Sequence, residues 1–345
     1  MADMRKMFIA AVSAVLAAGS MAPAAYAEER PWRVTRTPLM VSDAGLSRVA
    51  ALGPEEVWVG GHEGRFCYDW SIPFLGAGRK CEFSTTVKRW NGVFWETKNP
   101  PVTWNLELLD LDASSSGNVW FAGEKNLEDR FFRWDGNKWN EIVLPTEICS
   151  SISTVSGLSL TAVGTDELWA AWGRECVMHW KAGEWTVHPT PGLHIEKVHA
   201  LGANDVYLSP VSPARKPLHW DGAAWAEVNG VPDAFLVGVD GDGSYYAELS
   251  NLRSVKHVSN GVTTALPLSP EPLPGSPADG YLLDAEGSLW RVDKTVAHRF
   301  DGASWQSTSL PVGSVTDVDP LPAPAGSLWA VGTAPDGTPA SLTNS

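Results

Sequence analysis

The chain has 345 residues, of which 44% are hydrophobic and 19% charged, and its formal net charge is −14. This length and apolar content are sufficient for a large buried core in one to three domains. The acidic balance argues against nucleic acids and anionic membranes as partners, because both carry negative charge. We therefore expect a globular protein with no nucleic-acid partner and no membrane insertion.

Residues 1–27 are organised like a secretory signal peptide. The short basic start "MADMRK" precedes the apolar run "FIAAVSAVLAAG", and Ala25-Tyr26-Ala27 forms an A-x-A cleavage site. The apolar run is much shorter than the ~20 residues that a membrane-spanning helix needs. We predict cleavage after Ala27, secretion or delivery to the periplasm, and a monomeric mature chain of residues 28–345.

After this segment the chain repeats one phrase with two aromatic residues five positions apart. The copies are "RWNGVFW", "RWDGNKW", "HWKAGEW", "HWDGAAW" and "RFDGASW", which begin at residues 89, 133, 179, 219 and 299. Gly falls at one of the two central positions of each copy, which is typical of the tight turns in two-residue β-hairpins. The two aromatic residues then lie directly opposite one another and form a cross-strand pair. Packing within a sheet accounts for the phrase without a ligand.

Two further predicted strands precede each hairpin. The second of them carries an aromatic residue after a turn signal, as in "EEVWVGG" and "GNVWFAG". Seven such aromatic residues mark seven units: Trp58, Trp120, Trp169, Tyr207, Tyr246, Trp290 and Trp329.

The seventh unit lacks a fourth strand at the C-terminus. The N-terminal stretch "PWRVTRTPL" resembles the fourth strand "KWNEIVLP" and can supply it. Radial sheets closed in this way form a β-propeller. The predicted fold is an all-β, seven-bladed β-propeller of four-stranded antiparallel blades, whose last blade is closed by the N-terminal strand.

The phrases "NDVY", "HWDGAAW" and "WAVG" resemble exported bacterial β-propellers with Trp-Asp-Gly repeats, a group placed loosely with kelch and galactose-oxidase-like propellers. The resemblance covers nearly the whole mature chain. It implies the fold and export, and no assigned activity. The copper site of galactose oxidase needs a Tyr–Cys cross-link, and no matching residues are found here. The resemblance therefore supplies an architecture and no catalytic residue.

The connections after the second and fourth strands of each unit vary in length and share one face of the predicted propeller. The longest, "GHEGRFCYDWSIPFLGAGRKCEFS", follows the second strand of unit 1, and we interpret it as a loop. Its Cys67 and Cys81 predict a disulfide that stabilises the excursion by about 3 kcal/mol. Cys149 and Cys176 fall on the same face and predict a second bridge, since four cysteines in an exported chain favour disulfides over zinc.

Of the 18 tryptophans, 15 fit the repeat and three do not. The three are Trp70, Trp104 and Trp172, and all map to the variable face. Exposed aromatic residues are typical of surfaces that bind sugars or proteins. With the neighbours of Trp70 in the insertion, the candidate ligand-binding residues are Arg65, Tyr68, Trp70, Phe74, Trp104 and Trp172. Alternatively, the three rings cover the core and Arg65 is a solvated loop charge.

Signals for catalysis are few. His179, His219 and His257 precede the first position of three hairpins, the last of them a weaker copy that begins with Val258, but Arg fills the same place in three others, which favours a structural role. No H-E-x-x-H motif is present, and we predict no cofactor and no metal site. Polar residues alternate along several predicted inner strands and could line the channel, where several acids could hold a cation: Asp110, Asp112, Lys197, His199, Asp317 and Asp319.

Three functions remain open at this point. The favoured hypothesis is an exported non-enzymatic β-propeller that binds a protein or a glycan through its variable face, since no nucleophile or acid–base group converges in the sequence. One alternative is a hydrolase or lyase with a site at the channel mouth. Another is a purely structural protein of the envelope or extracellular space.

Overall fold

The computed structural model describes residues 30–345, apart from residues 73, 75, 146–157, 172–174, 191, 213–214, 229–233, 241–244, 250–252, 274–279 and 325. All regular secondary structure in these residues is β, in 28 strands. Within the same residues, no helix is long and apolar enough to cross a membrane.

The strands form seven four-stranded antiparallel sheets, and six of these use consecutive strands. Blade 1 contains β2 (Gly45–Gly53), β3 (Glu56–Ile72), β4 (Gly76–Trp90) and β5 (Trp95–Thr97). Blade 2 contains β6 (Glu107–Ser115), β7 (Asn118–Lys125), β8 (Glu128–Trp134) and β9 (Trp139–Ile142). Blade 3 contains β10 (Ser159–Val163), β11 (Glu167–Ala171), β12 (Cys176–Lys181) and β13 (Glu184–Pro189).

The remaining sheets follow the same order. Blade 4 contains β14 (Ile195–Gly202), β15 (Asp205–Pro210), β16 (Leu218–Trp220) and β17 (Trp225–Glu227). Blade 5 contains β18 (Ala234–Val239), β19 (Tyr245–Leu249), β20 (Val255–Ser259) and β21 (Val262–Ala265). Blade 6 contains β22 (Tyr281–Leu283), β23 (Leu289–Val292), β24 (Val296–Phe300) and β25 (Trp305–Ser309).

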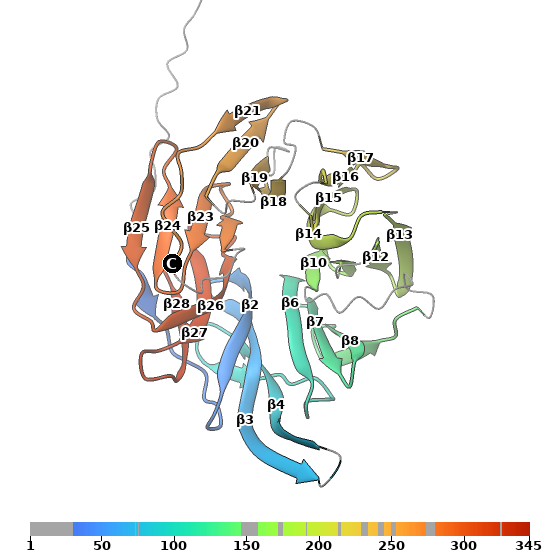
Figure 1. Ribbon diagram of the computed structural model, residues 1–345, viewed down its shortest axis with the longest axis vertical. Helices are drawn as coiled ribbons and strands as arrows, with labels where there is room; N and C mark the ends of the chain where they lie inside the picture. The colour runs from blue at the N-terminus through green and yellow to red at the C-terminus, as the bar shows by residue number, and fades with distance from the viewer. Residues whose placement is uncertain are drawn as a thin grey trace, which may run out of the picture.

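The last sheet joins the two ends of the described chain. It runs β26 (Ser314–Pro320), β27 (Leu328–Thr333), β28 (Pro339–Thr343) and β1 (Arg33–Val34), and Val34 pairs with Leu342. The sheets stand around a central axis, with the first strand of each blade innermost (Figure 1). Because β1 comes from the start of the described chain, its pairing with β28 connects the first and last blades.

The predicted hairpin pairs are confirmed. The two aromatic residues of each phrase lie directly opposite: Trp90 and Trp95, Trp134 and Trp139, Trp180 and Trp185, Trp220 and Trp225, Phe300 and Trp305. The turn between them needs a positive φ, which Gly136 adopts at 94°. Glycine takes this conformation without the strain that a Cβ would cause.

The aromatic residue of each second strand faces a basic residue on the third strand. Arg or His lies directly opposite it in six blades, as Arg89 does with Trp58 and His179 with Trp169. The His179 ring stacks on the Trp169 ring at 4.2 Å and its Nε2 lies 2.8 Å from an oxygen of Glu167. His219 makes the equivalent stack on Tyr207. The structural role predicted for the recurrent histidines is therefore confirmed.

Tryptophan rings also join neighbouring blades. Trp58 of blade 1 is fully buried, and its ring centroid lies 5.5 Å from that of Trp134 in blade 2. The indole N–H of Trp139 donates to the carbonyl of Lys98 in blade 1 at 2.7 Å. Burial of such large rings is the main apolar contribution between sheets. The indoles that fit the repeat therefore hold the blades together.

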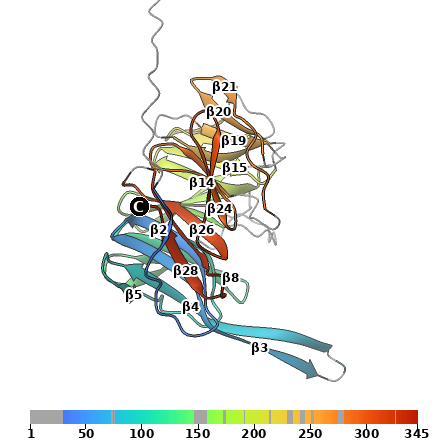
Figure 2. The same ribbon diagram turned by 90° about the vertical axis from the view of Figure 1, so that its left-hand side faces the viewer.

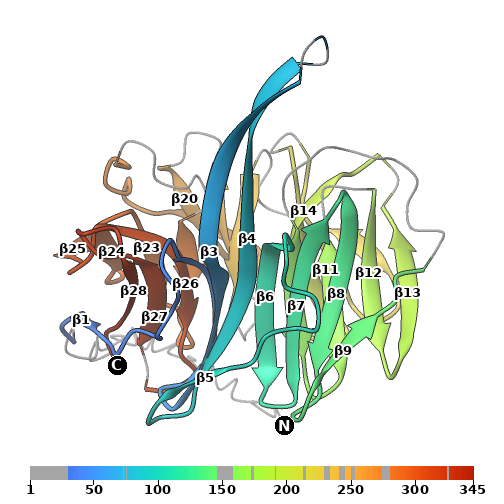
Figure 3. The ribbon, with the colours of Figure 1, turned by 90° about the horizontal axis from the view of Figure 1, so that it is seen from below.

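The interpretation of the blade 1 insertion as a loop was wrong. β3 and β4 continue through it as paired strands that project well beyond the other blades (Figures 2 and 3). The residues "FCYDWSI" alternate apolar and polar side chains, which is the period of a strand. The insertion is therefore a β-ribbon, and we use this term for residues 64–84.

Candidate functional site

The ribbon has a regular register with two distinct faces. Tyr68 pairs with Lys80, and Trp70 pairs with Gly78. Since successive side chains of a strand point to opposite faces, the even-numbered residues of this register share one face and the odd-numbered residues share the other. The two faces therefore differ in chemistry, and each can be described by itself.

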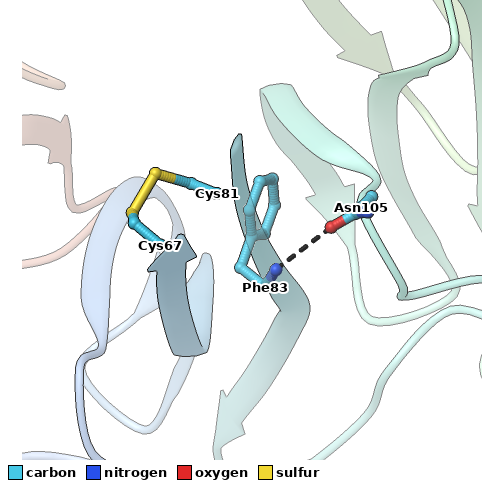
Figure 4. Close-up of a disulfide and its surroundings, with 4 residues drawn as sticks. All are labelled: Cys67, Cys81, Phe83 and Asn105. Carbon is cyan, nitrogen blue, oxygen red and sulfur yellow. Dashed lines mark hydrogen bonds between the residues drawn. A yellow bond between two sulfur atoms is a disulfide. The ribbon is translucent and has the colours of Figure 1, made fainter. Parts of the chain in front are cut away.

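A disulfide lies on the odd-numbered face. Cys67 and Cys81 are directly opposite in the register and are bonded, with their Cα atoms 4.0 Å apart (Figure 4). This predicted bridge is confirmed. Cys176 is also disulfide-bonded, while Cys149 lies outside the described residues, so its predicted pairing stays a prediction. The disulfide fixes the register of the two ribbon strands where they project beyond the four-stranded sheet of blade 1.

The even-numbered face is apolar and exposed. Its row along β3 consists of Phe66, Tyr68, Trp70 and Ile72, whose side chains are 49%, 42%, 40% and 49% exposed. The Trp70 indole lies across the partner strand at Gly78, where an added Cβ would come within 3.1 Å of the ring. An aromatic ring over a cross-strand glycine stabilises the pair of strands. Even so, a large part of each ring remains open to solvent.

Trp104 extends this face by one strand. It forms an isolated antiparallel bridge with Ser84 of β4, and its ring centroid lies 6.2 Å from that of Phe66. Phe66 in turn stacks with Tyr68 at 6.2 Å. The structure thus places Tyr68, Trp70 and Trp104, three of the predicted binding residues, on one surface. We call Phe66, Tyr68, Trp70, Ile72 and Trp104 the aromatic face.

The other predicted binding residues lie apart from this face. Phe74 lies at the tip of the ribbon and its side chain is fully exposed. Arg65 is exposed at the root, where its backbone N–H donates to the carbonyl of Asp43. Trp172 lies outside the described residues. The sequence analysis missed Phe66 and Ile72, although the alternation of "FCYDWSI" contains both.

The polar groups on the aromatic face are already paired with one another. Lys80 Nζ lies 2.8 Å from Glu82, and the Tyr68 hydroxyl donates to the same carboxylate at 3.2 Å. The hydrogen bond from Lys80 lowers the pKa of Glu82 and raises that of Lys80. The face therefore offers apolar rings bordered by one ion pair.

The channel mouth forms a second candidate site. A cavity of about 440 Å³ opens between the inner strands and is lined by charged side chains that include Arg48, Asp110, Lys197 and Asp317. Arg48 lies 3.5 Å from Asp110, and its Nε donates to the carbonyl of Leu109. Of the polar residues predicted to line the channel, Asp110, Lys197 and Asp317 lie in the wall of this cavity.

Each channel aspartate binds the backbone of the next blade. Asp110 and Asp112 accept hydrogen bonds from the amides of Leu160 and Ala162 at 2.8 and 2.6 Å. Asp317 and Asp319 do the same with the amides of Val49 and Ala51 at 2.8 and 2.7 Å. The carboxylates therefore connect neighbouring inner strands.

Burial dominates the electrostatics of these aspartates. It raises the pKa of Asp112 and of Asp317 to about 7, and that of Asp319 well above the usual range. Nearby carboxylates add to the effect on Asp112 and Asp319. Across the described residues, no group of His, Cys, Asp or Glu side chains could hold a metal ion. The expected acids are present, but their geometry is that of links between blades.

Comparisons with known proteins agree with this architecture. A catalytically inactive virginiamycin B lyase from Staphylococcus aureus, solved with quinupristin, has a similar structure: TM-score 0.63, 12% identity, 91% of this chain and 99% of that chain covered. YCF48 bound to D1 peptide has a TM-score of 0.60 at 13% identity, with 91% and 96% covered. The chain is a β-propeller.

The WD40 propeller domain of Doa1 is similar as well, with a TM-score of 0.56, 14% identity, and 91% of this chain and 97% of that chain covered. Identities this low show the fold alone. No protein-family model matches the sequence, and no curated protein matches it. The function of this propeller therefore has to be argued from its own residues.

Proposed function

We propose that this protein is an exported, non-enzymatic β-propeller that binds a partner protein through the aromatic face of its ribbon. The observation that carries the proposal is a row of four half-exposed apolar side chains on a projecting ribbon whose register a disulfide fixes. Exposed apolar residues gathered on a rigid element are typical of protein interfaces. A rigid element also loses little conformational entropy on binding.

A protein partner fits this surface better than a glycan. Sugar recognition needs hydrogen-bonding groups beside the ring, and the carboxylate of Glu82 is engaged by Lys80 and Tyr68. The surface follows a projecting ribbon, whereas sites for small ligands are concave. Similar propellers include one solved with a bound peptide. The channel mouth is the weaker candidate because its aspartates already accept backbone hydrogen bonds.

Export is part of the proposal. The signal-like segment of residues 1–27 and the disulfide on an exposed ribbon support it, since disulfides persist in oxidising compartments. The mature protein should begin at Glu28. N-terminal sequencing of the protein from the periplasm or the medium checks this expectation, and an uncleaved, cytoplasmic protein would contradict it.

Binding is tested with two matched triple variants. Tyr68→Ser, Trp70→Ser and Trp104→Ser together remove three rings of the aromatic face. The control carries Val93→Ser, Phe94→Ser and Val262→Ser, which change exposed apolar residues at hairpins of the opposite face. Both sets alter surface residues, which contribute little to folding. The proteins are used as baits for the exported fraction of the source cells, and any captured protein is then purified and titrated.

The expected result is one partner that binds the wild type and the control alike and that binds the ribbon variant at least ~100-fold more weakly, since several anchors are removed together. Equal affinity for the two triple variants would refute the proposal. A glycan array is run on the same proteins. A glycan that binds the wild type and not the ribbon variant would show that the ligand of the aromatic face is a glycan and not a protein.

A further inference from the structure

The ribbon has free backbone groups along the outer edge of β4. At its root, the amide of Thr85 donates to Thr103 at 2.9 Å, and the amide of Asn105 donates to the carbonyl of Phe83 at 3.0 Å. Odd-numbered residues of β4 therefore direct their N–H and C=O groups away from β3. By the same alternation, Ala77, Arg79 and Cys81 direct theirs outward. No described residue pairs with them there.

Residues 103–105 already form the beginning of a third strand on this edge. Trp104 bridges Ser84 in antiparallel orientation, and the Asn105 side chain accepts a hydrogen bond from the Phe83 amide at 3.1 Å (Figure 4). Asn105 then adopts a φ of 50°, and the chain leaves the edge toward Leu106, which is fully buried. The third strand thus stops where the projecting part of the ribbon begins.

We propose that the partner protein binds by adding an extended segment to this open edge, antiparallel to β4 and in line with residues 103–105. This inference rests on the proposed function and specifies its mode of binding. Strand addition satisfies the unpaired backbone groups of an edge, and side chains at alternate positions of the added strand provide specificity. The edge consists of the backbone groups of Ala77, Arg79 and Cys81.

The aromatic face defines which segment fits. Trp104, opposite Ser84, contributes its ring to this face, so the added residues opposite Glu82, Lys80 and Gly78 direct their side chains to the same face. Gly78 has no side chain, and the Trp70 indole lies across it. The residue opposite Gly78 therefore packs on that indole, and we expect it to be aromatic or branched aliphatic. Proline is excluded at the positions whose amides bond the edge.

The test uses a library of linear ten-residue peptides, displayed on phage and selected on the intact, disulfide-bonded protein. Selected peptides are synthesised and titrated against the wild type, Arg79→Ala and Arg79→Pro. The proline variant removes an outward N–H that β3 does not use, and the alanine variant is the control for loss of the side chain. We expect binding to Arg79→Pro at least ~10-fold weaker than to Arg79→Ala, because an edge hydrogen bond is lost and the pyrrolidine ring obstructs the strand.

Amide hydrogen exchange on the wild-type protein gives a second reading that does not depend on a variant. The amides of Ala77, Arg79 and Cys81 are expected to become protected when a selected peptide binds. Peptides that need Trp70 but bind both Arg79 variants equally, without this protection, would overturn strand addition and leave the proposed function standing. A selection that yields no peptide dependent on the ribbon would also overturn strand addition, while the triple variants decide the proposed function separately.

Discussion

The ribbon and the channel wall are both rich in residues that the repeat does not explain, yet they differ in what those residues bind. In the channel, Asp110 and Asp317 accept amides of the neighbouring inner strands. On the ribbon, Phe66 and Trp70 expose 49% and 40% of their side chains. The channel residues have partners within the fold, and the ribbon residues keep apolar surface for a partner outside it.

This difference separates a structural role from a binding role by physical criteria. A carboxylate buried with a backbone donor contributes to the cohesion of the ring, and its loss affects folding. A half-exposed ring on a projecting ribbon contributes little to the core, so that its loss affects association. Changes in the two regions should therefore appear in different measurements.

Two tryptophans of blade 1 give the largest expected contrast. Trp58 is fully buried between blades, and Trp70 is 40% exposed on the ribbon. Trp58→Ala is expected to lower the free energy of unfolding by about 3–5 kcal/mol, because a large cavity remains between the sheets. Trp70→Ala is expected to lower it by less than about 1 kcal/mol.

Urea denaturation followed by tryptophan fluorescence and by circular dichroism measures both values. Binding of the partner is expected to show the reverse order: impaired in Trp70→Ala, and retained in Trp58→Ala wherever that variant is folded. A large loss of stability from Trp70→Ala would assign this ring to the core and remove it from the aromatic face.

The channel wall predicts a dependence of stability on pH. Burial raises the pKa of Asp112 to about 7 in the folded protein, whereas an unfolded aspartate titrates near 4. Between these values the folded state retains a proton that the unfolded state has lost. The free energy of unfolding therefore falls as pH rises through this interval.

Asp112→Asn keeps an oxygen to accept the Ala162 amide and removes the charge. It should reduce the fall in stability between pH 4.5 and pH 8 by roughly 1–2 kcal/mol, a figure below the full shift because the side chain is only partly buried. Asp336→Asn, at an exposed turn, is the control. If both variants keep the wild-type dependence of the unfolding free energy on pH, Asp112 is not the source of that dependence.

The hairpins could be predicted from the sequence because their determinants are local. A turn residue between two aromatic residues five positions apart defines both the register and the pairing, as Trp134 and Trp139 show. The aspartate links could not be predicted in the same way. The alternation of Asp110 and Asp112 was visible, but the amide that Asp110 binds lies 50 residues away, in another blade.

The candidate site was partly predictable. Trp70 and Trp104 were selected because they depart from the repeat, and both lie on the aromatic face. The ring contacts of Phe66 with Trp104 and with Tyr68 depend on a ribbon, whereas the sequence analysis interprets residues 61–84 as a loop. The strand period of "FCYDWSI" was the available signal, and it also identifies Phe66 and Ile72.

Changes at the hairpin turns should have the smallest effect. The turns belong neither to the ribbon nor to the channel wall, so they serve as a reference for both regions. The Asp135 carboxylate accepts hydrogen bonds from the amide of Lys138 at 2.9 Å, the side chain of Asn140 at 2.7 Å and the amide of Asn137 at 2.9 Å, and these bonds lower its pKa to about 2. The contribution of the ionised Asp135 carboxylate to stability is therefore complete above pH ~4 and is lost as pH falls toward 2.

Blade 1 already contains the matched control for this turn. Asn91 occupies the equivalent position, and its side-chain oxygen accepts the amides of Val93 and Phe94 at 3.1 and 2.9 Å. Asp135→Asn keeps the oxygen that accepts the two backbone amides, so it should lower the Tm at pH 7 less than Asp135→Ala does, and it should abolish the acid sensitivity of this turn. Asp135→Ala should lower the Tm by roughly 1–2 °C at pH 7. Calorimetry at pH 7 and pH 3 separates the two variants, and equal melting temperatures for both at pH 7 would show that the acceptor oxygen does not stabilise the turn. Partner binding should be unchanged in both variants, because the turn lies in blade 2 and the aromatic face belongs to the ribbon of blade 1.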